Sequence, residues 1–195
     1  PEAFKKKILK ISPAQIDRLL RPARVGHPKK GLSTTRPGTL LRHAVPTRHG
    51  PPDTTRIGSV EDDTVAHCDD STEGNYVNSL TFTELGSGWT ENRAVWNKSA
   101  AAVLVQLQEL EKIVPYTMKD FHTDNGGEFM NATVAAYCET HGIPCTRSRP
   151  YKKNDQATIE SKNNHLVRKY GFYYRYDTDE ERAVLNRLWK LVNDR

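Results

Sequence analysis

The sequence predicts an α/β domain in which helices cover a mixed five-stranded sheet. Three strand-like segments come first, and two more then alternate with helical segments. Consecutive strands pair antiparallel through short turns, whereas strands joined through helices pair in parallel. The order β-β-β-α-β-α-β-α-α therefore predicts a sheet with both kinds of pairing, covered by helices.

Three segments after residue 56 favour strands. They are Val60 to Ala66, Tyr76 to Thr83, in which Leu80 and Phe82 share one side, and Trp89 to Trp96, which follows a Gly-Ser-Gly turn at 86–88. Alternation of apolar and polar residues is typical of strands with one buried face. An antiparallel meander is the simplest arrangement of these three.

Helices and strands then alternate. Ser99 caps a helix that carries Val103, Leu107 and Leu110 on one face. The later elements are expected at 118–124 (strand), 133–141 (helix), 143–147 (strand), from Asn154 or Asp155 (helix) and from about Asp179 to the end (helix).

The chain divides into three parts. We expect residues 1–24 to be the end of a helix-turn-helix-like DNA-binding segment. Ser12-Pro13-Ala14-Gln15 is typical of a capped helix start, and a lysine-rich stretch at 4–9 precedes it. Two unrelated surface helices would give the same pattern. Residues 25–56, rich in proline, predict an extended basic linker, and residues 57–195 form the core.

Positive charge is concentrated at the front of the chain. Residues 1–56 hold 13 Lys and Arg against three acids, although the whole chain has a net charge of only +5. Such a segment suits the phosphate backbone of DNA, but a solvated tail has the same composition.

Other features exclude several classes of protein. The longest apolar run has six residues, which is too short to span a membrane. The three cysteines form no CxxC pair, so we expect reduced thiols and no structural zinc. No secretory signal pattern opens the sequence, and we expect an intracellular protein.

Three acidic residues are candidates for chemistry: Asp63 in the first strand, Asp124 at the end of the fourth, and Glu160 in the third core helix. Three convergent carboxylates suffice to hold two hard divalent cations for phosphoryl transfer. Each acid also has an ordinary structural explanation. An Asp before Asn-Gly is often a turn former, and a Glu near a helix start favours the helix dipole.

The motifs around these acids resemble a known family. They are Thr64 to Cys68, the stretch Asp124-Asn125-Gly126-Gly127-Glu128-Phe129, and the run from Arg149 to Gln156 that leads to Glu160-Ser161-Lys162-Asn163; 35 residues separate Asp124 from Glu160. From Gly58 to Tyr176 the chain resembles the retroviral-integrase-type catalytic core of bacterial insertion-sequence transposases. Residues 11–20 and 31–35 are also similar to the DNA-binding region before that core.

The resemblance implies a ribonuclease-H-like fold and a set of metal ligands. Asp63, Asp124 and Glu160 match the two aspartates and the glutamate that bind two Mg²⁺ ions, for which Mn²⁺ substitutes. It implies that water opens a phosphodiester at the end of a mobile element and that the freed 3′ hydroxyl attacks target DNA. It further implies that the protein binds mobile-element ends and target DNA and forms at least a dimer on DNA. The implied location is the bacterial cytoplasm, in association with the nucleoid.

The chain departs from the family pattern at two places. Asp62 stands where the family usually has a hydrophobic residue, so that either Asp62 or Asp63 is available as the first ligand; we choose Asp63 because Thr64-Val65 follows it in register. Neighbouring residues of a strand point to opposite faces, but the sequence does not tell which face is which. Asp69-Asp70 replaces the expected glycines, and a solvent-exposed acidic turn explains them without metal binding.

Four basic residues near Glu160 are candidates for contacts with the DNA backbone. Lys152 and Lys153 precede the catalytic helix, and Lys162 and Arg168 lie on it. Lys and Arg commonly supply such positioning contacts, although any exposed helix carries similar charges. His67 and His122 are interpreted either as structural or as groups that support the metal ligands, because metal activation of the attacking oxygen requires no histidine base.

Three functions remain open at this stage. The first is an active transposase or integrase. The second is a ribonuclease-H-like nuclease that cuts without joining, against which the spacing and the Asn-Gly-Gly-Glu-Phe motif argue. The third is a DNA-binding or regulatory remnant that has lost catalysis, although the sequence retains all three acids.

Overall fold

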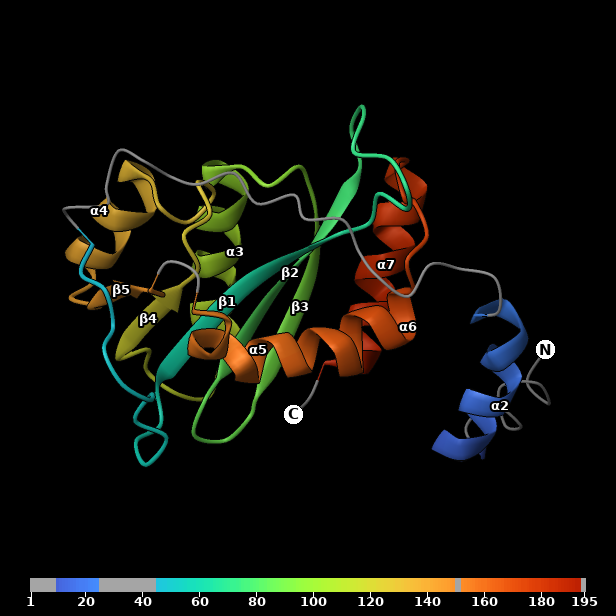
Figure 1. The fold of residues 1–195 in the computed structure, drawn as a ribbon, viewed down its shortest axis with the longest axis horizontal. Coiled ribbons are helices and arrows are strands. Elements are labelled where there is room, and N and C mark those ends of the chain that lie inside the picture. The colour runs from blue at the N-terminus through green and yellow to red at the C-terminus, as the bar shows by residue number, and fades with distance from the viewer. Residues whose placement is uncertain (1–9, 25–44, 150–151, 194–195) are drawn as a thin grey trace.

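A five-stranded mixed sheet forms the centre of the molecule. The structure is a computed structural model that describes residues 10–24, 45–149 and 152–193 of the 195-residue chain. The sheet has the order β3-β2-β1-β4-β5 (Figure 1). Its strands are β1 (Ser59–Ala66), β2 (Val77–Glu84), β3 (Thr90–Trp96), β4 (Asp120–Thr123) and β5 (Cys145–Arg147). β1 to β3 form the predicted antiparallel meander, whereas β4 pairs in parallel with both β1 and β5.

Helices cover both faces of the sheet (Figure 1). On one face, α3 (Ala100–Ile113) and α4 (Ala132–Thr140) contribute Val103, Leu107 and Val134 to a core with Leu80 and Phe82. On the other face run α5 (Ala157–Lys162), η2 (Asn163–Arg168), α6 (Lys169–Gly171) and α7 (Asp179–Val192). A second, smaller core there contains Val65, Val167, Leu185 and Trp189. The predicted fold class is confirmed.

Polar caps fix where the helices begin. The Ser99 hydroxyl accepts a hydrogen bond from the amide of Ala102, and the Asn131 side chain accepts one from Val134. At α7, Thr178 and Glu181 form a reciprocal capping box. Such caps satisfy amides that have no partner within the helix, which explains why these helices start where they do.

The helix that carries Glu160 begins later than the sequence predicts. Residues 153–156 form a 3₁₀ turn, η1 (Lys153–Gln156), and the α-helix starts at Ala157. Asp155 does not cap the helix, because its carboxylate is taken by Arg149. The helix then continues through η2, a π-helical stretch. Such stretches are rare and frequently lie at functional sites.

The front of the chain contains one described helix, α2 (Pro13–Arg24). Ser12 and Gln15 form the expected capping box, since each side chain accepts a hydrogen bond from the backbone amide of the other. The Tyr174 hydroxyl donates a hydrogen bond to the carbonyl of Ala23. The lysine-rich stretch at 4–9, most of the linker and the segment 31–35 lie outside the described residues. None of the helices in the described part of the chain is long and apolar enough to cross a membrane.

Candidate functional site

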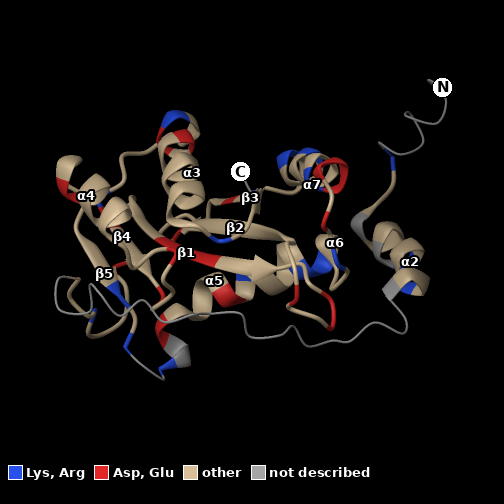
Figure 2. Cartoon of the chain, turned by 90° about the horizontal axis from the view of Figure 1, so that it is seen from above, with Lys and Arg blue, Asp and Glu red and all other residues tan. Residues whose placement is uncertain are grey.

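Two adjacent aspartates of β1 point to opposite faces of the sheet. Asp62 lies opposite Phe82 and therefore shares its face with the larger core, beneath α3 and α4. Asp63 faces the other side, where its carboxylate meets Asn163 of η2. The acidic residues of β1 thus lie between the two helical layers (Figure 2). Of the two aspartates, Asp63 is the one that faces the helical run carrying Glu160.

Asp62 is a buried acid among other polar groups. It is fully buried, and neither carboxylate oxygen has a hydrogen bond of good geometry among the described residues, although the Thr123 hydroxyl is close enough to lower its pKa. Burial, together with the charge of nearby Asp124, raises its pKa well above the ordinary value. An unpaired buried carboxylate is costly when ionised, so this environment favours the neutral form of Asp62.

Asp63 is held by two hydrogen bonds. The amide of Thr64 donates to Oδ1 over 2.7 Å, and the side-chain Nδ2 of Asn163 donates to Oδ2 over 2.7 Å. Burial and the charge of Asp124 raise the pKa of Asp63 to about 7. The carboxylate is therefore fixed in orientation and lies in a field that favours its neutralisation by a proton or a cation.

Asp124 lies in the turn that follows β4. The amide of Gly126 donates to its Oδ1 over 2.5 Å. A Cβ atom on Gly126 would lie 2.6 Å from that oxygen and 2.8 Å from Oε2 of Glu128, so a larger residue would displace these carboxylates. Burial raises the pKa of Asp124 to about 6, and the Glu128 charge contributes. The Asn-Gly-Gly motif thus permits two acids to approach each other closely.

Glu160 is exposed on α5, and its carboxylate does not group with those of the two aspartates. Residues on both sides of it along the helix contact β1: the Gln156 side chain donates to the carbonyl of Asp62, and Asn163 donates to Asp63. These residues stand at i−4 and i+3 from Glu160, and positions so spaced share a helix face. Glu160 therefore lies at the edge of the helix face that contacts β1, next to the buried Ile159, with its own side chain exposed.

The three acids do not form a closed metal centre. Within the described ranges, no three His, Cys, Asp or Glu side chains come together closely enough to hold an ion. The structure brings Asp63 and Asp124 within electrostatic range, but Glu160 is not among the groups that shift either pKa. The carboxylate chemistry still fits a hard divalent cation, whose preferred ligands are oxygens.

Lys98 and Glu128 border the aspartates, and the sequence interpretation did not single them out as site residues. Lys98 Nζ lies 3.3 Å from Oε1 of Glu128, and the Thr64 hydroxyl donates to the same oxygen over 3.0 Å. The charge of Lys98 lowers the pKa values of both Asp63 and Asp124. Lys98 follows β3 by two residues, a position that no local motif connects with the acids.

The four basic candidates differ in their surroundings. Lys152 is exposed, Lys153 begins η1, and Lys162 lies beside the turn at Gly88. Arg168 is half-buried: its guanidinium lies 4.6 Å from the ring centre of Tyr173, and it donates to the carbonyl of Phe172. Lys152 is therefore more accessible to a ligand than Arg168.

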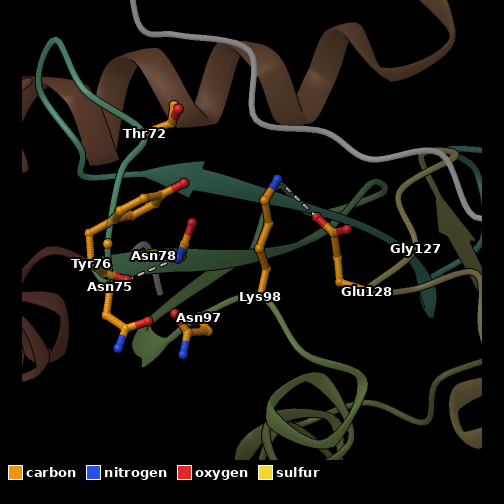
Figure 3. A pocket seen from close by; sticks show the side chains of 9 residues that line it. Thr72, Asn75, Tyr76, Asn78, Asn97, Lys98, Gly127 and Glu128 are labelled. Atoms are coloured by element: carbon orange, nitrogen blue, oxygen red, sulfur yellow. Dashed lines mark hydrogen bonds and ion pairs between the residues drawn. The ribbon is translucent and has the colours of Figure 1, made fainter.

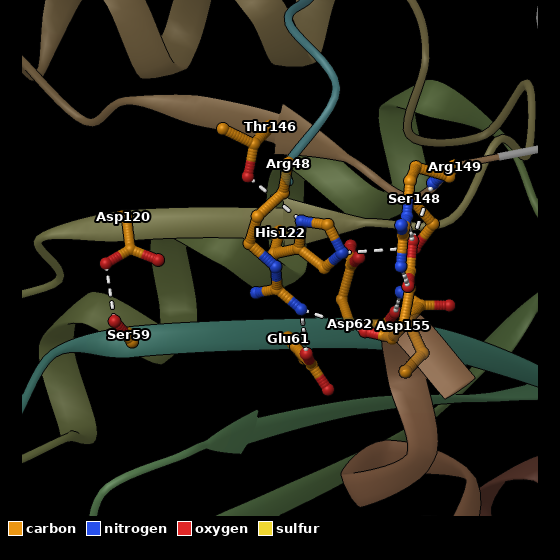
Figure 4. Close-up of polar contacts among 11 residues, drawn as sticks. Arg48, Ser59, Glu61, Asp62, Asp120, His122, Thr146, Ser148, Arg149 and Asp155 are labelled. Carbon is orange, nitrogen blue, oxygen red and sulfur yellow. Dashed lines mark hydrogen bonds and ion pairs between the residues drawn. The ribbon is translucent and has the colours of Figure 1, made fainter. Parts of the chain in front are cut away.

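A polar network fixes the start of the Glu160 helix (Figure 4). Arg149 donates to both carboxylate oxygens of Asp155, over 2.9 and 2.6 Å. Arg48, from the segment before β1, donates to Glu61 over 2.7 Å and to the carbonyl of Asp155 over 2.8 Å. These bonds attach η1 to the middle strand of the sheet and so set the distance between Glu160 and Asp63.

His67 and His122 are both buried, and each shares at least one side-chain hydrogen bond, although Nδ1 of His67 has no partner among the described residues. His67 shares a hydrogen bond with Ser79, and His122 shares hydrogen bonds with Thr146 and Ser148. Burial lowers the pKa of each to about 3. They are neutral structural groups, one of the two roles that the sequence interpretation left open.

Comparisons with known proteins agree with this geometry. The chain is 36% identical over 189 residues to a protein of Sinorhizobium fredii (strain NBRC 101917 / NGR234) described as "Uncharacterized protein y4rM". The match covers 95% of this chain but only 53% of that protein, so the chain spans about half the length of this curated relative. The catalytic core domain of BIV integrase has a similar structure, with a TM-score of 0.50 and 21% identity over 71% of this chain and 85% of that one.

The structural match confirms the expected ribonuclease-H-like fold. Residues 53–153 match the family described as Integrase core domain, which covers more than half of the sequence and includes Asp63, Asp124 and Glu128. The chain therefore belongs to the integrase core domain family.

Proposed function

We propose that this chain is the catalytic core of a DNA transposase or integrase, which cleaves DNA at the ends of a mobile element and joins the 3′ ends to target DNA. The observation that carries the proposal is the approach of Asp63 and Asp124 beside a helix that carries Glu160 and is attached to β1. Carboxylates that raise one another's pKa are frequent at functional sites.

The donor set fits Mg²⁺, with Mn²⁺ as a substitute. We assign Asp63, Asp124 and Glu160 as the ligands of two ions in the active complex. A cation replaces the protons that burial and neighbouring carboxylate charges favour on the aspartates. When bound, two such ions activate the attacking oxygen and stabilise the leaving oxygen of a phosphodiester.

The protein's own groups position these ligands. Thr64 and Asn163 fix both oxygens of Asp63, and the Gly126 amide orients Asp124. Lys152, Lys153, Lys162 and Arg168 are proposed contacts for the DNA backbone. Because Arg168 is engaged with Tyr173 and Phe172, we expect Lys152 to contribute more to binding.

The proposed arrangement of the whole chain follows the sequence. Residues 1–24 supply a DNA-binding segment, 25–56 a basic linker that tracks DNA, and 57–195 the catalytic core. Joining two element ends requires at least two protomers, so we propose a homo-oligomer on DNA. The proposed location is the bacterial cytoplasm, on the nucleoid.

A branched DNA that mimics the joined product tests the reaction without knowledge of the terminal sequences. Strand joining exchanges one phosphodiester for another, so that the same site resolves the branch in reverse. We expect Mg²⁺-dependent resolution that Asp124→Asn reduces about a hundredfold or more while DNA binding persists. Asp70→Asn, at an exposed acid in the β1–β2 loop, is the matched control. Activity that survives Asp124→Asn would remove the basis of the proposal.

A catalytically inactive DNA-binding remnant is the second candidate. Two observations favour it: the partnerless buried carboxylate of Asp62 beside Asp63, and the separation of Glu160 from the aspartates. In this case the wild-type chain binds the branched DNA but does not resolve it. If Asp62→Ile then gained activity, Asp62 would be the cause of the lost catalysis.

A further inference from the structure

A polar pocket of about 490 Å³ opens beside the candidate metal ligands. Three loops form it: the β1–β2 loop with Thr72 and Asn75, the β3–α3 loop with Asn97 and Lys98, and the β4–α4 loop with Gly127 and Glu128. Figure 3 shows Lys98 and Glu128 paired on one side, and Tyr76 and Asn78 on the other. A Cβ atom on Gly126 would lie 2.8 Å from Oε2 of Glu128 and 2.6 Å from Oδ1 of Asp124, so the wall of the pocket adjoins the candidate ligand Asp124.

Asn78 gives the pocket an unused acceptor. Asn78 is 1% exposed, and its Nδ2 donates to the carbonyl of Tyr76 over 3.3 Å. Its Oδ1 has no hydrogen-bond partner among the described residues. Buried amide oxygens are nearly always paired, so an unpaired one in a pocket wall is available to a donor from outside the chain.

The loop that closes the pocket is held in place before any ligand binds. Arg175 donates to the carbonyls of Ser71, Glu73 and Asn75, over 3.1, 2.8 and 3.1 Å. Its guanidinium also lies 5.6 Å from the ring centre of Tyr76. A pocket formed in advance binds its ligand without the cost of ordering a loop.

The chemistry of the lining matches the edge of a nucleobase. Side-chain amides commonly read base edges, an ammonium ion serves base acceptors or phosphate, and an aromatic ring offers a wall for a flat base. The volume is sufficient for one base, and the position next to Asp124 means that the base belongs to a nucleotide close to the reacting phosphate.

We propose that this pocket is a subsite that receives one unpaired base of the DNA substrate beside the reacting phosphate, with Asn78 as the residue that accepts a hydrogen bond from it. The inference rests on the proposed function. Enzymes that work on DNA accept such extruded bases where unpairing costs little, as at a branch. The base belongs either to the element end or to the target strand.

Branched DNA with a single abasic residue distinguishes these two sources. Each nucleotide next to the junction is made abasic in turn, in the end strand or in the target strand, and affinity is measured by fluorescence anisotropy without Mg²⁺. We expect one position at which the missing base weakens binding to the wild type about tenfold. The strand that contains this position identifies the source of the base.

Two variants connect that loss with the pocket. Asn78→Leu removes the acceptor at similar side-chain size. Asn97→Gly removes a second amide at a residue with φ of +49°, where glycine is favoured, so this variant keeps the fold even if Asn78→Leu does not. Both should bind intact and abasic DNA with similar affinity. Gln108→Ala, at an exposed amide on α3, is the control. It should retain the wild-type difference in affinity between intact and abasic DNA.

The results separate the two proposals. If every abasic DNA binds the wild type within about twofold of intact DNA, or if both variants keep the tenfold difference, the base subsite is wrong. If the difference is present and depends on Asn78 and Asn97, but the wild type never resolves the branch with Mg²⁺, the subsite stands and the proposed function fails. Asp124→Asn should no longer resolve the branched DNA, but it should still bind intact DNA more tightly than abasic DNA.

Discussion

The side chain of Asn163 donates a 2.7 Å hydrogen bond to Oδ2 of Asp63, across the interface between helix and sheet. Asn163 is 6% exposed and stands three residues after Glu160. One bond therefore fixes a candidate metal ligand on β1 and the helix that carries another. This link makes the register of α5 on the sheet a determinant of the site.

Asn163→Ala should weaken metal binding, because Asp63 loses the group that orients it. Loss of a residue that orients a metal ligand typically costs about tenfold to a hundredfold in affinity or activity. The measurement is the Mn²⁺ concentration that half-saturates the thermal shift of the protein. Asn164→Ala, at the exposed neighbour, is the control. Equal Mn²⁺ affinity in both variants would show that Asn163 does not position Asp63.

Asp62→Ile should stabilise the fold, because an unpaired buried carboxylate is replaced by an apolar side chain facing the larger core. The expected gain in the free energy of unfolding is about 1–3 kcal/mol at neutral pH. Urea unfolding measures it, and Asp62→Asn, which leaves a polar group buried, should gain less. A loss of stability in Asp62→Ile would mean that the carboxylate has a favourable partner.

Metal binding should release protons at mildly acidic pH. The pKa of Asp63 is raised to about 7 and that of Asp124 to about 6, both from an ordinary value of 3.8. Below the unfolded-state pKa of these groups, their protons stabilise the fold fully. This stabilisation is lost as the pH rises through 6 to 7, where a cation can replace the protons. Titration calorimetry in buffers of different ionisation enthalpy should find roughly one to two protons released per protein near pH 6 and almost none near pH 8. Equal release at both values would contradict the assignment.

His67 should make the fold sensitive to acid. Burial lowers its folded-state pKa from 6.5 to about 3, so the unfolded chain takes up a proton first as the pH falls. The contribution of neutral His67 is fully present above about pH 6.5 and declines below it, by about 1.4 kcal/mol per pH unit. His67→Gln should lack this part of the slope when unfolding is followed between pH 6.5 and 4.5. Parallel curves for the two proteins would exclude the effect.

The sequence contains enough information for the fold but only for part of the site. Short capping signals at Ser99 and Ser12 and the alternation around Leu80 act locally, so their elements were predictable. The face on which Asp62 or Asp63 lies depends on the pairing of β1 with β2 and on the helices packed on each side. The strand pattern alone does not contain that information.

The base pocket was not predictable, because its residues come from three loops that only the folded sheet brings together. Lys98, Asn78 and Arg175 belong to no shared motif, and Arg175 reaches the β1–β2 loop across about a hundred residues of sequence. The later start of the Glu160 helix likewise depends on the pairing of Arg149 with Asp155.

Diffraction from a crystal soaked in Mn²⁺, with the branched DNA bound, tests the central claim most directly. We expect anomalous peaks between Asp63 and Asp124, with carboxylate oxygens at about 2.0–2.2 Å and Glu160 turned inward to complete the ligand set. Ordered DNA with no peak at Asp63 and Asp124, or a peak bound by Asp62 instead of Asp63, would contradict that claim.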